Sequence, residues 1–104
     1  MARIPYCDID KAPQAIQDLV AKLPPLNIMR MMAHGHTVMR PYLDLGGALL
    51  WKGELDPQLR EMAILRVGYL SDAAYETYQH ERISRQLGMP EEKIQALKVG
   101  ADDS

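Results

Sequence analysis

Glu76 and His80 suggest chemistry more directly than any other pair in the sequence, because they lie four positions apart in the stretch AAYETYQH. In a helix this spacing makes their side chains neighbours. A helical wheel places both on the side that carries most of the aliphatic residues of the segment. A carboxylate beside an imidazole, partly withdrawn from water, is suited to proton transfer near neutral pH. The alternative is a structural or solvated pair, with Tyr75 and Tyr78 on the buried side.

A second carboxylate, Glu61, lies in the preceding segment LDPQLREMAILRVGYL, which is otherwise mostly apolar. A short break separates this segment from the helix of Glu76 and His80, so the two helices are expected to form an antiparallel hairpin. Across such a hairpin Glu61 could meet His80. The alternative for Glu61 is an interaction within its own first turn, where the helix dipole favours acidic side chains.

The spacing of apolar residues, with the positions of proline and glycine, predicts an all-α fold, a small bundle of about six helices. Asp56-Pro57 gives the clearest helix start, because a capping aspartate precedes a proline at the first helical position. Asp10 and Thr37 are candidate caps of two earlier helices. The expected helices span about residues 11–23, 26–35, 37–53, 57–70, 72–88 and 90–98.

Length and composition limit the class of protein. A chain of 104 residues is at most one domain, 1–104, in which an N-terminal helix over about residues 11–23 precedes the main part of the domain, its core region 26–100. A net charge of −2 gives no general reason to bind nucleic acid or an acidic membrane surface, and no stretch approaches the about 20 apolar residues of a membrane span. Cys7 is the only cysteine, which excludes an intrachain disulfide. With no signal-peptide pattern at the start of the sequence, these features predict a cytoplasmic protein.

Taken together, these segments resemble the carboxymuconolactone decarboxylase family, whose superfamily includes alkylhydroperoxidase D. The resemblance is carried by LDPQLREMAILRV, a Ser/Asp break, AAYETYQHERISRQLG and PEEKIQAL, and it extends to MRPYLDLGGALLWKGELD and RIPYCDID. It covers nearly all of residues 3–100 and is strongest at 55–97. It implies an alkylhydroperoxidase D-like helical bundle that assembles as a homo-oligomer, a trimer or a hexamer.

The peroxidase branch of this superfamily has a C-x-x-C-x-x-x-H pattern and a relay glutamate on the preceding helix. When the patterns are aligned on His80, the two cysteine positions hold Ala73 and Glu76, and the relay glutamate matches Glu61. Peroxide reduction by that route needs a thiolate and a resolving thiol, and Cys7 matches neither position. Alkylhydroperoxidase or peroxiredoxin-type antioxidant activity is therefore an alternative at the level of the superfamily only.

The decarboxylase branch resembles the sequence better at this site, because it also has an acid four residues before the histidine. The resemblance implies lyase-type chemistry on a small carboxylated or lactone substrate. His80 would be the acid/base, and Glu76 or Glu61 its orienting or proton-relay partner. Arg66 or Arg40 could hold a substrate carboxylate. For each arginine the alternative is a solvated or salt-bridged surface residue.

His34 fits the family pattern and is a third candidate for substrate binding, whereas His36 does not fit it. In principle these histidines could join Glu76 and His80 in a metal site, but nothing in the sequence places the segments together. The stretch HERIS also lacks the second histidine of an H-E-x-x-H motif. We therefore expect no metal and no cofactor. The interpretation favours an enzyme with a small-molecule substrate, and a non-catalytic helical module that binds a ligand or a partner is the alternative.

Overall fold

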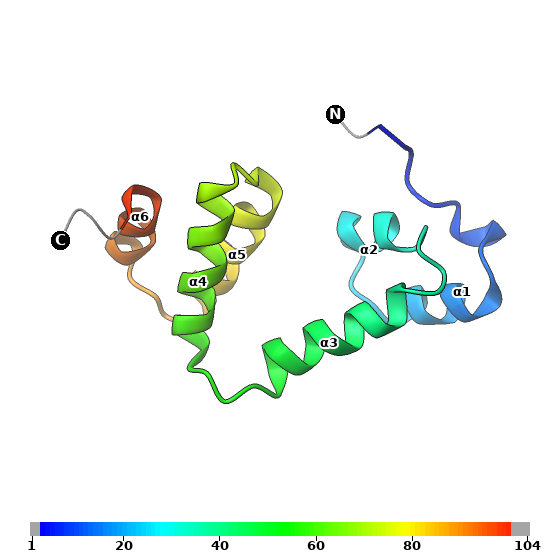
Figure 1. Ribbon diagram of the computed structural model, residues 1–104, viewed down its shortest axis with the longest axis horizontal. Coiled ribbons are helices and arrows are strands. Elements are labelled where there is room, and N and C mark those ends of the chain that lie inside the picture. Colours follow the sequence, from blue (N-terminus) through cyan, green and yellow to red (C-terminus); the bar gives the residue numbers. More distant parts are fainter. Residues whose placement is uncertain (1–2, 101–104) are drawn as a thin grey trace. The chain divides into compact units, whose positions relative to one another are not determined.

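The computed structural model describes residues 3–100, and this range holds six α-helices, one short 3₁₀-helix and no strand (Figure 1). The predicted all-α fold is thereby confirmed. The chain divides into two compact units, Met1–Lys52 and Gly53–Ser104. Compact units also occur within single domains, so the single domain over residues 1–104 stays a prediction. No helix within the described range is both long and apolar enough to cross a membrane.

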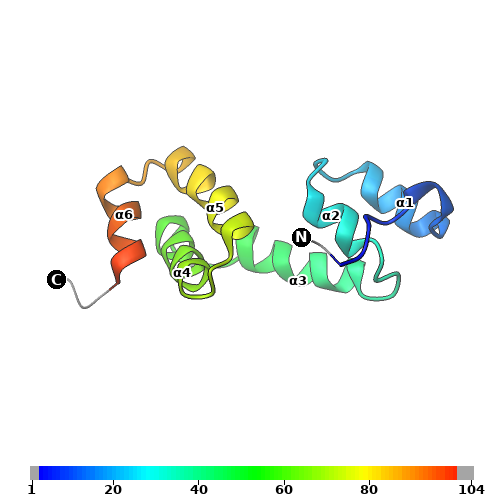
Figure 2. The same cartoon turned by 90° about the horizontal axis from the view of Figure 1, so that it is seen from above.

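The first unit contains the 3₁₀-helix η1 (Ile9–Lys11) and the helices α1 (Gln14–Ala21), α2 (Asn27–Met32) and α3 (Met39–Trp51). Figure 2 shows α1 and α2 beside the amino-terminal end of α3. These elements share one apolar core, because helix α1 turns its apolar face toward the end of α2 and the start of α3. The buried residues of this core are Ala12, Ile16, Leu19, Ala33 and Met39.

Two predicted helix caps in this unit are wrong. Asp10 lies in η1, and α1 begins only after Pro13, whose carbonyl accepts the first hydrogen bond of the helix from the N–H of Ile16. Thr37 lies in a turn that closes on the carbonyl of Gly35, so α3 begins two residues later at Met39. In both places a backbone turn fixes where the helix starts, and the side chain of the expected cap makes no capping bond.

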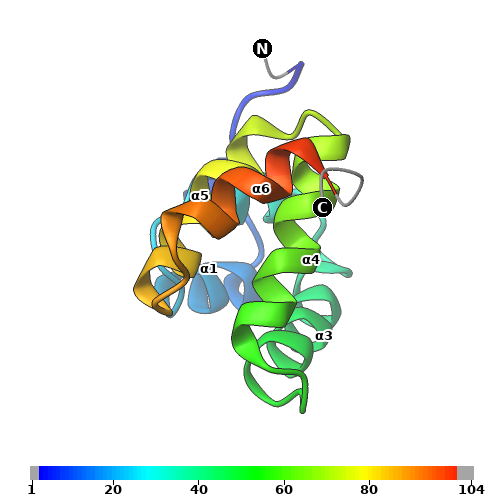
Figure 3. The same cartoon turned by 90° about the vertical axis from the view of Figure 1, so that its left-hand side faces the viewer.

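The second unit contains α4 (Pro57–Leu70), α5 (Ala74–Gln86) and α6 (Glu91–Val99). Helix α4 packs against both of the other helices, and Figure 3 shows α6 running across it. Leu65, Met89 and Ile94 form the buried apolar core of this unit. The core is small, so polar contacts between the helices matter for holding them in place.

Helices α4 and α5 form the predicted hairpin. Asp56 caps α4 by accepting hydrogen bonds from the backbone N–H groups of Gln58 and Leu59, at 2.9 and 3.2 Å, which confirms the predicted helix start. At the other end, the turn between the helices places Asp72 in the left-handed region with φ of 52°. Asparagine and aspartate tolerate this conformation better than most residues.

Gly68 lets the two helices of the hairpin approach each other closely. It is buried, and a Cβ atom at this position would lie 2.7 Å from Cγ2 of Thr77 on α5. Its carbonyl also accepts a hydrogen bond of 2.9 Å from the N–H of Ala73 at the start of α5. The glycine thus fixes the spacing of α4 and α5 and, with it, the distance between side chains that face each other across the hairpin.

Candidate active site

Glu61 is a fully buried carboxylate on the face of α4 that packs against α5. It shares this face with Leu65 and Gly68, which follow it at helical spacing and are also buried. Its Oε2 atom lies 2.6 Å from Nδ1 of His80, and its Oε1 atom accepts a hydrogen bond of 3.1 Å from Nε of Arg60. A buried carboxylate is costly unless it is paired and hydrogen-bonded, and here both oxygens have a nitrogen partner.

The structure therefore brings Glu61 and His80 together across the hairpin. Because a carboxylate only accepts hydrogen bonds, the short bond assigns the proton to Nδ1 when Glu61 is ionised. The other ring nitrogen, Nε2, is then the atom that can accept or deliver a proton. The backbone of His80 is held as well, since the buried hydroxyl of Ser84 donates a 2.7 Å hydrogen bond to its carbonyl.

Nε2 of His80 faces the second carboxylate, Glu76. Its distance to Oε2 of Glu76 is 3.7 Å, which is an ion-pair distance rather than a hydrogen bond. The side chain of His80 is 15% exposed and that of Glu76 is 44% exposed, whereas Glu61 has no exposed surface. The three groups thus form a series from the buried carboxylate through the imidazole to the accessible carboxylate.

A pocket of about 380 Å³ begins where this series ends. Glu76 forms part of its wall, and the rest of the wall comes from α4 and from the turn into α5. The lining residues are Ala63, Ile64, Val67, Gly68, Ser71, Ala73 and Glu76. A mostly apolar concave surface with a few polar groups is the usual form of a small-molecule site. The arrangement can therefore place a small ligand against Glu76, with His80 behind it.

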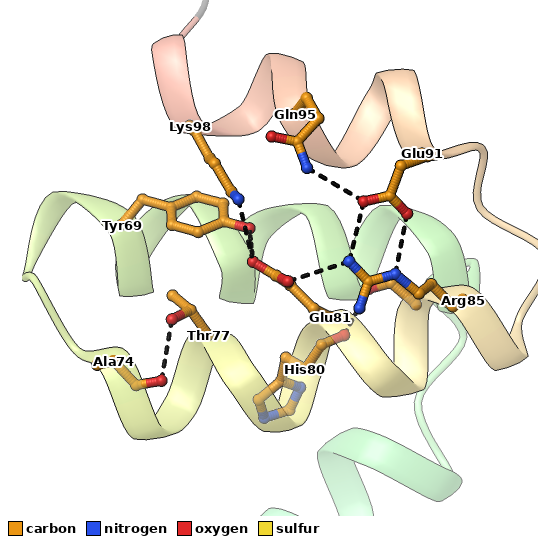
Figure 4. Close-up of polar contacts among 10 residues, drawn as sticks. Tyr69, Ala74, Thr77, His80, Glu81, Arg85, Glu91, Gln95 and Lys98 are labelled. Atoms are coloured by element: carbon orange, nitrogen blue, oxygen red, sulfur yellow. Dashed lines mark hydrogen bonds and ion pairs between the residues drawn. The ribbon is translucent and has the colours of Figure 1, made fainter.

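A second polar cluster lies in this unit and was missed from the sequence. Figure 4 shows Glu81 leaving α5 in a different direction from His80 and meeting Tyr69 and Arg85. The hydroxyl of Tyr69 donates a 2.6 Å hydrogen bond to Glu81, and Arg85 donates one of 3.1 Å to the same carboxylate. Arg85 also binds both carboxylate oxygens of Glu91, each at 2.9 Å. The spacing of four between Glu81 and Arg85 was the signal that could have revealed it.

The contacts within this cluster shift the pKa values of its members. Burial, followed by the hydrogen bond to Glu81, raises the pKa of the Tyr69 hydroxyl well above its usual range. The hydrogen bond from Tyr69 lowers the pKa of Glu81. The hydrogen bonds from Arg85 lower the pKa of Glu91 to about 2. The cluster links α4, α5 and α6, because Tyr69 lies in α4, Glu81 in α5 and Glu91 at the start of α6.

The three candidate substrate ligands lie in other surroundings. Arg66 donates hydrogen bonds of 3.0 and 3.4 Å to the carbonyls of Leu97 and Lys98 at the carboxyl-terminal end of α6, and it lines a different pocket. Arg40 is exposed on α3, and Nε2 of His34 lies 2.8 Å from the carbonyl oxygen of Pro5. Arg40 and His34 belong to the first unit. Substrate binding by any of the three stays a prediction.

Metal-binding side chains do not gather in the described part of the chain. Within residues 3–100, no group of three or more histidine, cysteine, aspartate or glutamate side chains is arranged to hold a metal ion. His36 is exposed in the first unit, and Cys7 is a half-buried free thiol there. Neither takes part in the series of Glu61, His80 and Glu76.

Comparison with known proteins identifies one family. The model of the Carboxymuconolactone decarboxylase family matches residues 37–103, which is more than half of the chain. The matched range contains Glu61, Glu76 and His80, together with the pocket beside them. No curated protein and no solved structure matches the chain.

Proposed function

We propose that this chain, which belongs to the carboxymuconolactone decarboxylase family, is a thiol-independent enzyme. It would use acid–base chemistry of the lyase type on a small carboxylated or lactone substrate. The observation that carries this proposal is the 2.6 Å bond between Glu61 and His80, which leaves Nε2 facing Glu76, a residue of the pocket wall. An imidazole oriented by a buried carboxylate is a common device for proton transfer.

Each of the three groups has a distinct proposed role. Glu61 is a positioning residue, because its bond to Nδ1 fixes the ring and stabilises the imidazolium that forms when Nε2 takes up a proton. His80 is the acid/base. Glu76 lines the pocket, so it is the carboxylate that contacts the substrate and relays protons to and from Nε2. The sequence left open which carboxylate orients the imidazole, and the burial of Glu61 supports assigning that role to it.

The two positions that hold cysteines in the peroxidase branch support chemistry without a thiol. Ala73 and Glu76 occupy them, and both line the pocket. An alanine methyl group offers no nucleophile, while the glutamate offers a proton acceptor. The site would therefore keep the shape of a catalytic pocket and carry out reactions that need only proton transfer and charge stabilisation.

A turnover assay with matched histidine variants tests this proposal. We expect His80→Asn to lower kcat/KM by about 10²- to 10⁴-fold on small lactones and carboxylated lactones followed by absorbance. The control His36→Asn alters an exposed histidine of the first unit and is expected to leave turnover unchanged. Glu61→Gln is expected to lower kcat and to alter the pH profile of kcat/KM, which a purely structural role would not do. Equal turnover by wild type and His80→Asn would refute the acid–base role.

The alternatives predict other outcomes. If the chain is a non-catalytic binding module, wild type binds small molecules but shows no turnover with any of these substrates. If it retains antioxidant activity, a thiol-dependent peroxidase assay shows turnover that Cys7→Ser abolishes. We expect no cysteine-dependent turnover, because Cys7 matches neither cysteine position of the peroxidase branch.

We also propose that the protein acts in the cytoplasm as a homo-oligomer, a trimer or a hexamer. Three large apolar side chains of the second unit, Leu70, Tyr78 and Val99, are each more than half exposed. A chain of this size has a small core and gains apolar burial by association. Light scattering after size-exclusion chromatography measures the mass directly, and a monomer at micromolar concentration would contradict the proposal.

A further inference from the structure

The pocket beside Glu76 has a charge pattern that constrains its ligand. Among its described lining residues Glu76 is the one charged side chain, and Ser71 offers the one other polar side chain. A smaller adjoining pocket shares Gly68 and Ala73 with it and adds a second acid, Asp72. The described lining of both pockets includes no lysine or arginine. A ligand in this place therefore meets apolar surface and negative charge.

The two arginines of α4 are engaged by other groups. Arg60 donates its Nε–H to the buried Glu61, and Arg66 donates to carbonyls at the end of α6. Neither arginine lines this pocket, and turning either side chain toward it would break these bonds. For Arg60, the cost includes leaving a buried carboxylate with one partner fewer.

We propose that this pocket binds an uncharged, mainly apolar molecule whose single carbonyl or hydroxyl group faces Glu76 and His80, and that it discriminates against carboxylates. A carboxylate placed here would lose water without gaining a cation and would be repelled by Glu76. A cation would also lose water against a lining that is apolar apart from Glu76 and Ser71, and its attraction to Glu76 is weakened by solvent because that side chain is 44% exposed. The inference rests on the proposed function, because it takes this pocket to be the one that His80 serves. Of the two substrate classes named above, the lactone fits and the carboxylated substrate does not.

The choice of substrate narrows the reaction. Decarboxylation needs a carboxylate held in the pocket, so the charge pattern disfavours it. A proton transfer next to the carbonyl of an unsaturated lactone remains: a carbon beside the carbonyl gives its proton, by way of Glu76, to His80, and a carbon of the double bond in the same molecule receives it back. This isomerisation keeps the acid–base part of the proposed function and replaces its lyase part. The substrate gains and loses no atoms, and no co-reactant is required. The result is a shift of a double bond within the ligand.

Three ligands of nearly the same shape test the charge preference. Benzamide is neutral, benzoate is an anion and benzamidine is a cation, and each is titrated into the whole 15N-labelled protein. We expect benzamide to shift the amide signals of Val67, Ala73 and Glu76, and benzoate to bind at least about tenfold more weakly. Equal binding of benzoate and benzamide at these residues would overturn the inference. Tighter binding of benzamidine than of benzamide would also overturn it, since the pocket would then be a cation site.

Variants of the lining locate the binding and reverse its preference. Ala63→Phe fills the pocket and is expected to weaken benzamide at least tenfold, whereas Ala48→Phe, at an exposed alanine of α3, leaves it unchanged. Val67 is 63% exposed, so Val67→Arg places a cation at the pocket with little risk to folding. It is expected to make benzoate bind more tightly than benzamide. Failure of Val67→Arg to improve benzoate binding would refute the proposed location.

These measurements separate this inference from the proposed function. They record binding and need no turnover. Equal affinities for benzoate and benzamide would therefore refute the charge preference and leave the proposed role of His80 intact. Conversely, if His80→Asn retains full turnover while the benzamide preference holds, the acid–base proposal fails and the ligand preference stands.

Discussion

Replacing Glu61 with glutamine is the sharpest test of how the hairpin is held together. The substitution keeps the size and shape of the side chain but removes its negative charge. Glu61 is fully buried and receives Nδ1–H of His80 at 2.6 Å and Nε–H of Arg60 at 3.1 Å. A glutamine amide presents one oxygen and one NH₂ group, so it can accept from one of these donors while its NH₂ group opposes the other.

The expected loss follows from these contacts. A hydrogen bond to a charged group contributes about 1.5–3 kcal/mol, and leaving one partner of a buried pair unsatisfied adds a desolvation penalty. Losing one bond of this kind and weakening the other gives a destabilisation of about 2–4 kcal/mol. For a domain of this size each kcal/mol corresponds to about 4–8 °C, so the melting temperature is expected to fall on the order of 10–30 °C.

Glu76→Gln is the matched control, because Glu76 faces the same imidazole from the other side. Its side chain is 44% exposed and its oxygen lies 3.7 Å from Nε2, so the change is expected to cost no more than about 1 kcal/mol. Urea denaturation of wild type, both single variants, His80→Asn and the double variant of Glu61 and His80 measures the energies. The double-mutant cycle is expected to give a coupling of about 1–3 kcal/mol between Glu61 and His80.

Two results would refute this reasoning. If Glu61→Gln costs no more than Glu76→Gln, burial of Glu61 does not make its bonds important for stability. If the cycle shows no coupling while Glu61→Gln is still destabilising, the loss comes from Arg60 or from packing, and His80 is not held by this carboxylate.

Three further predictions concern the packing of the same unit. Leu65→Ala removes a fully buried side chain and is expected to lower the free energy of unfolding, measured by urea denaturation, by about 2–5 kcal/mol. The control Leu59→Ala lies at a half-exposed site of the same helix and is expected to change it by less than about 1 kcal/mol. Gly68→Ala places a methyl group against Cγ2 of Thr77 and is expected to destabilise the protein, and Thr77→Ser, which removes that methyl group, is expected to restore part of the loss. The pKa of Glu91 is lowered to about 2 in the folded state. Its contribution to the free energy of unfolding is therefore complete above its ordinary pKa near 4.5 and is lost as the pH falls toward 2. Over this range the urea midpoint is expected to fall less for Glu91→Gln than for wild type.

The sequence predicts the hairpin of α4 and α5 well, because local residues decide it. Asp56 and Pro57 start α4 through bonds and a backbone angle that depend only on neighbouring residues. The polar break around Asp72 likewise ends one helix and starts the next. The misplaced caps Asp10 and Thr37 show the limit of this reasoning, since turns closed by backbone carbonyls compete with a side-chain cap, and composition does not reveal which one forms.

The candidate site is only partly predictable, since it depends on contacts between helices. Periodicity places Glu76 and His80 on one side of α5, but it cannot show that Glu76 remains 44% exposed while Glu61 is buried completely. Burial of Glu61 depends on the close approach of α5, which Gly68 permits because a Cβ atom there would meet Thr77. A wheel treats each helix alone and contains no information on this approach.

The two polar clusters of the second unit explain how so small a core can hold a reactive group in place. Leu65, Met89 and Ile94 bury too little apolar surface to fix three helices firmly. The ion pairs and hydrogen bonds of Glu81 and Arg85 add links among α4, α5 and α6. Glu81 leaves α5 in a different direction from His80 (Figure 4). Because these links help to set the position of α5, the imidazole stays within hydrogen-bond distance of Glu61, while its Nε2 atom makes only the longer contact of 3.7 Å with Glu76. Its second nitrogen is thereby left available for proton transfer, which is the condition that acid–base chemistry in this pocket requires.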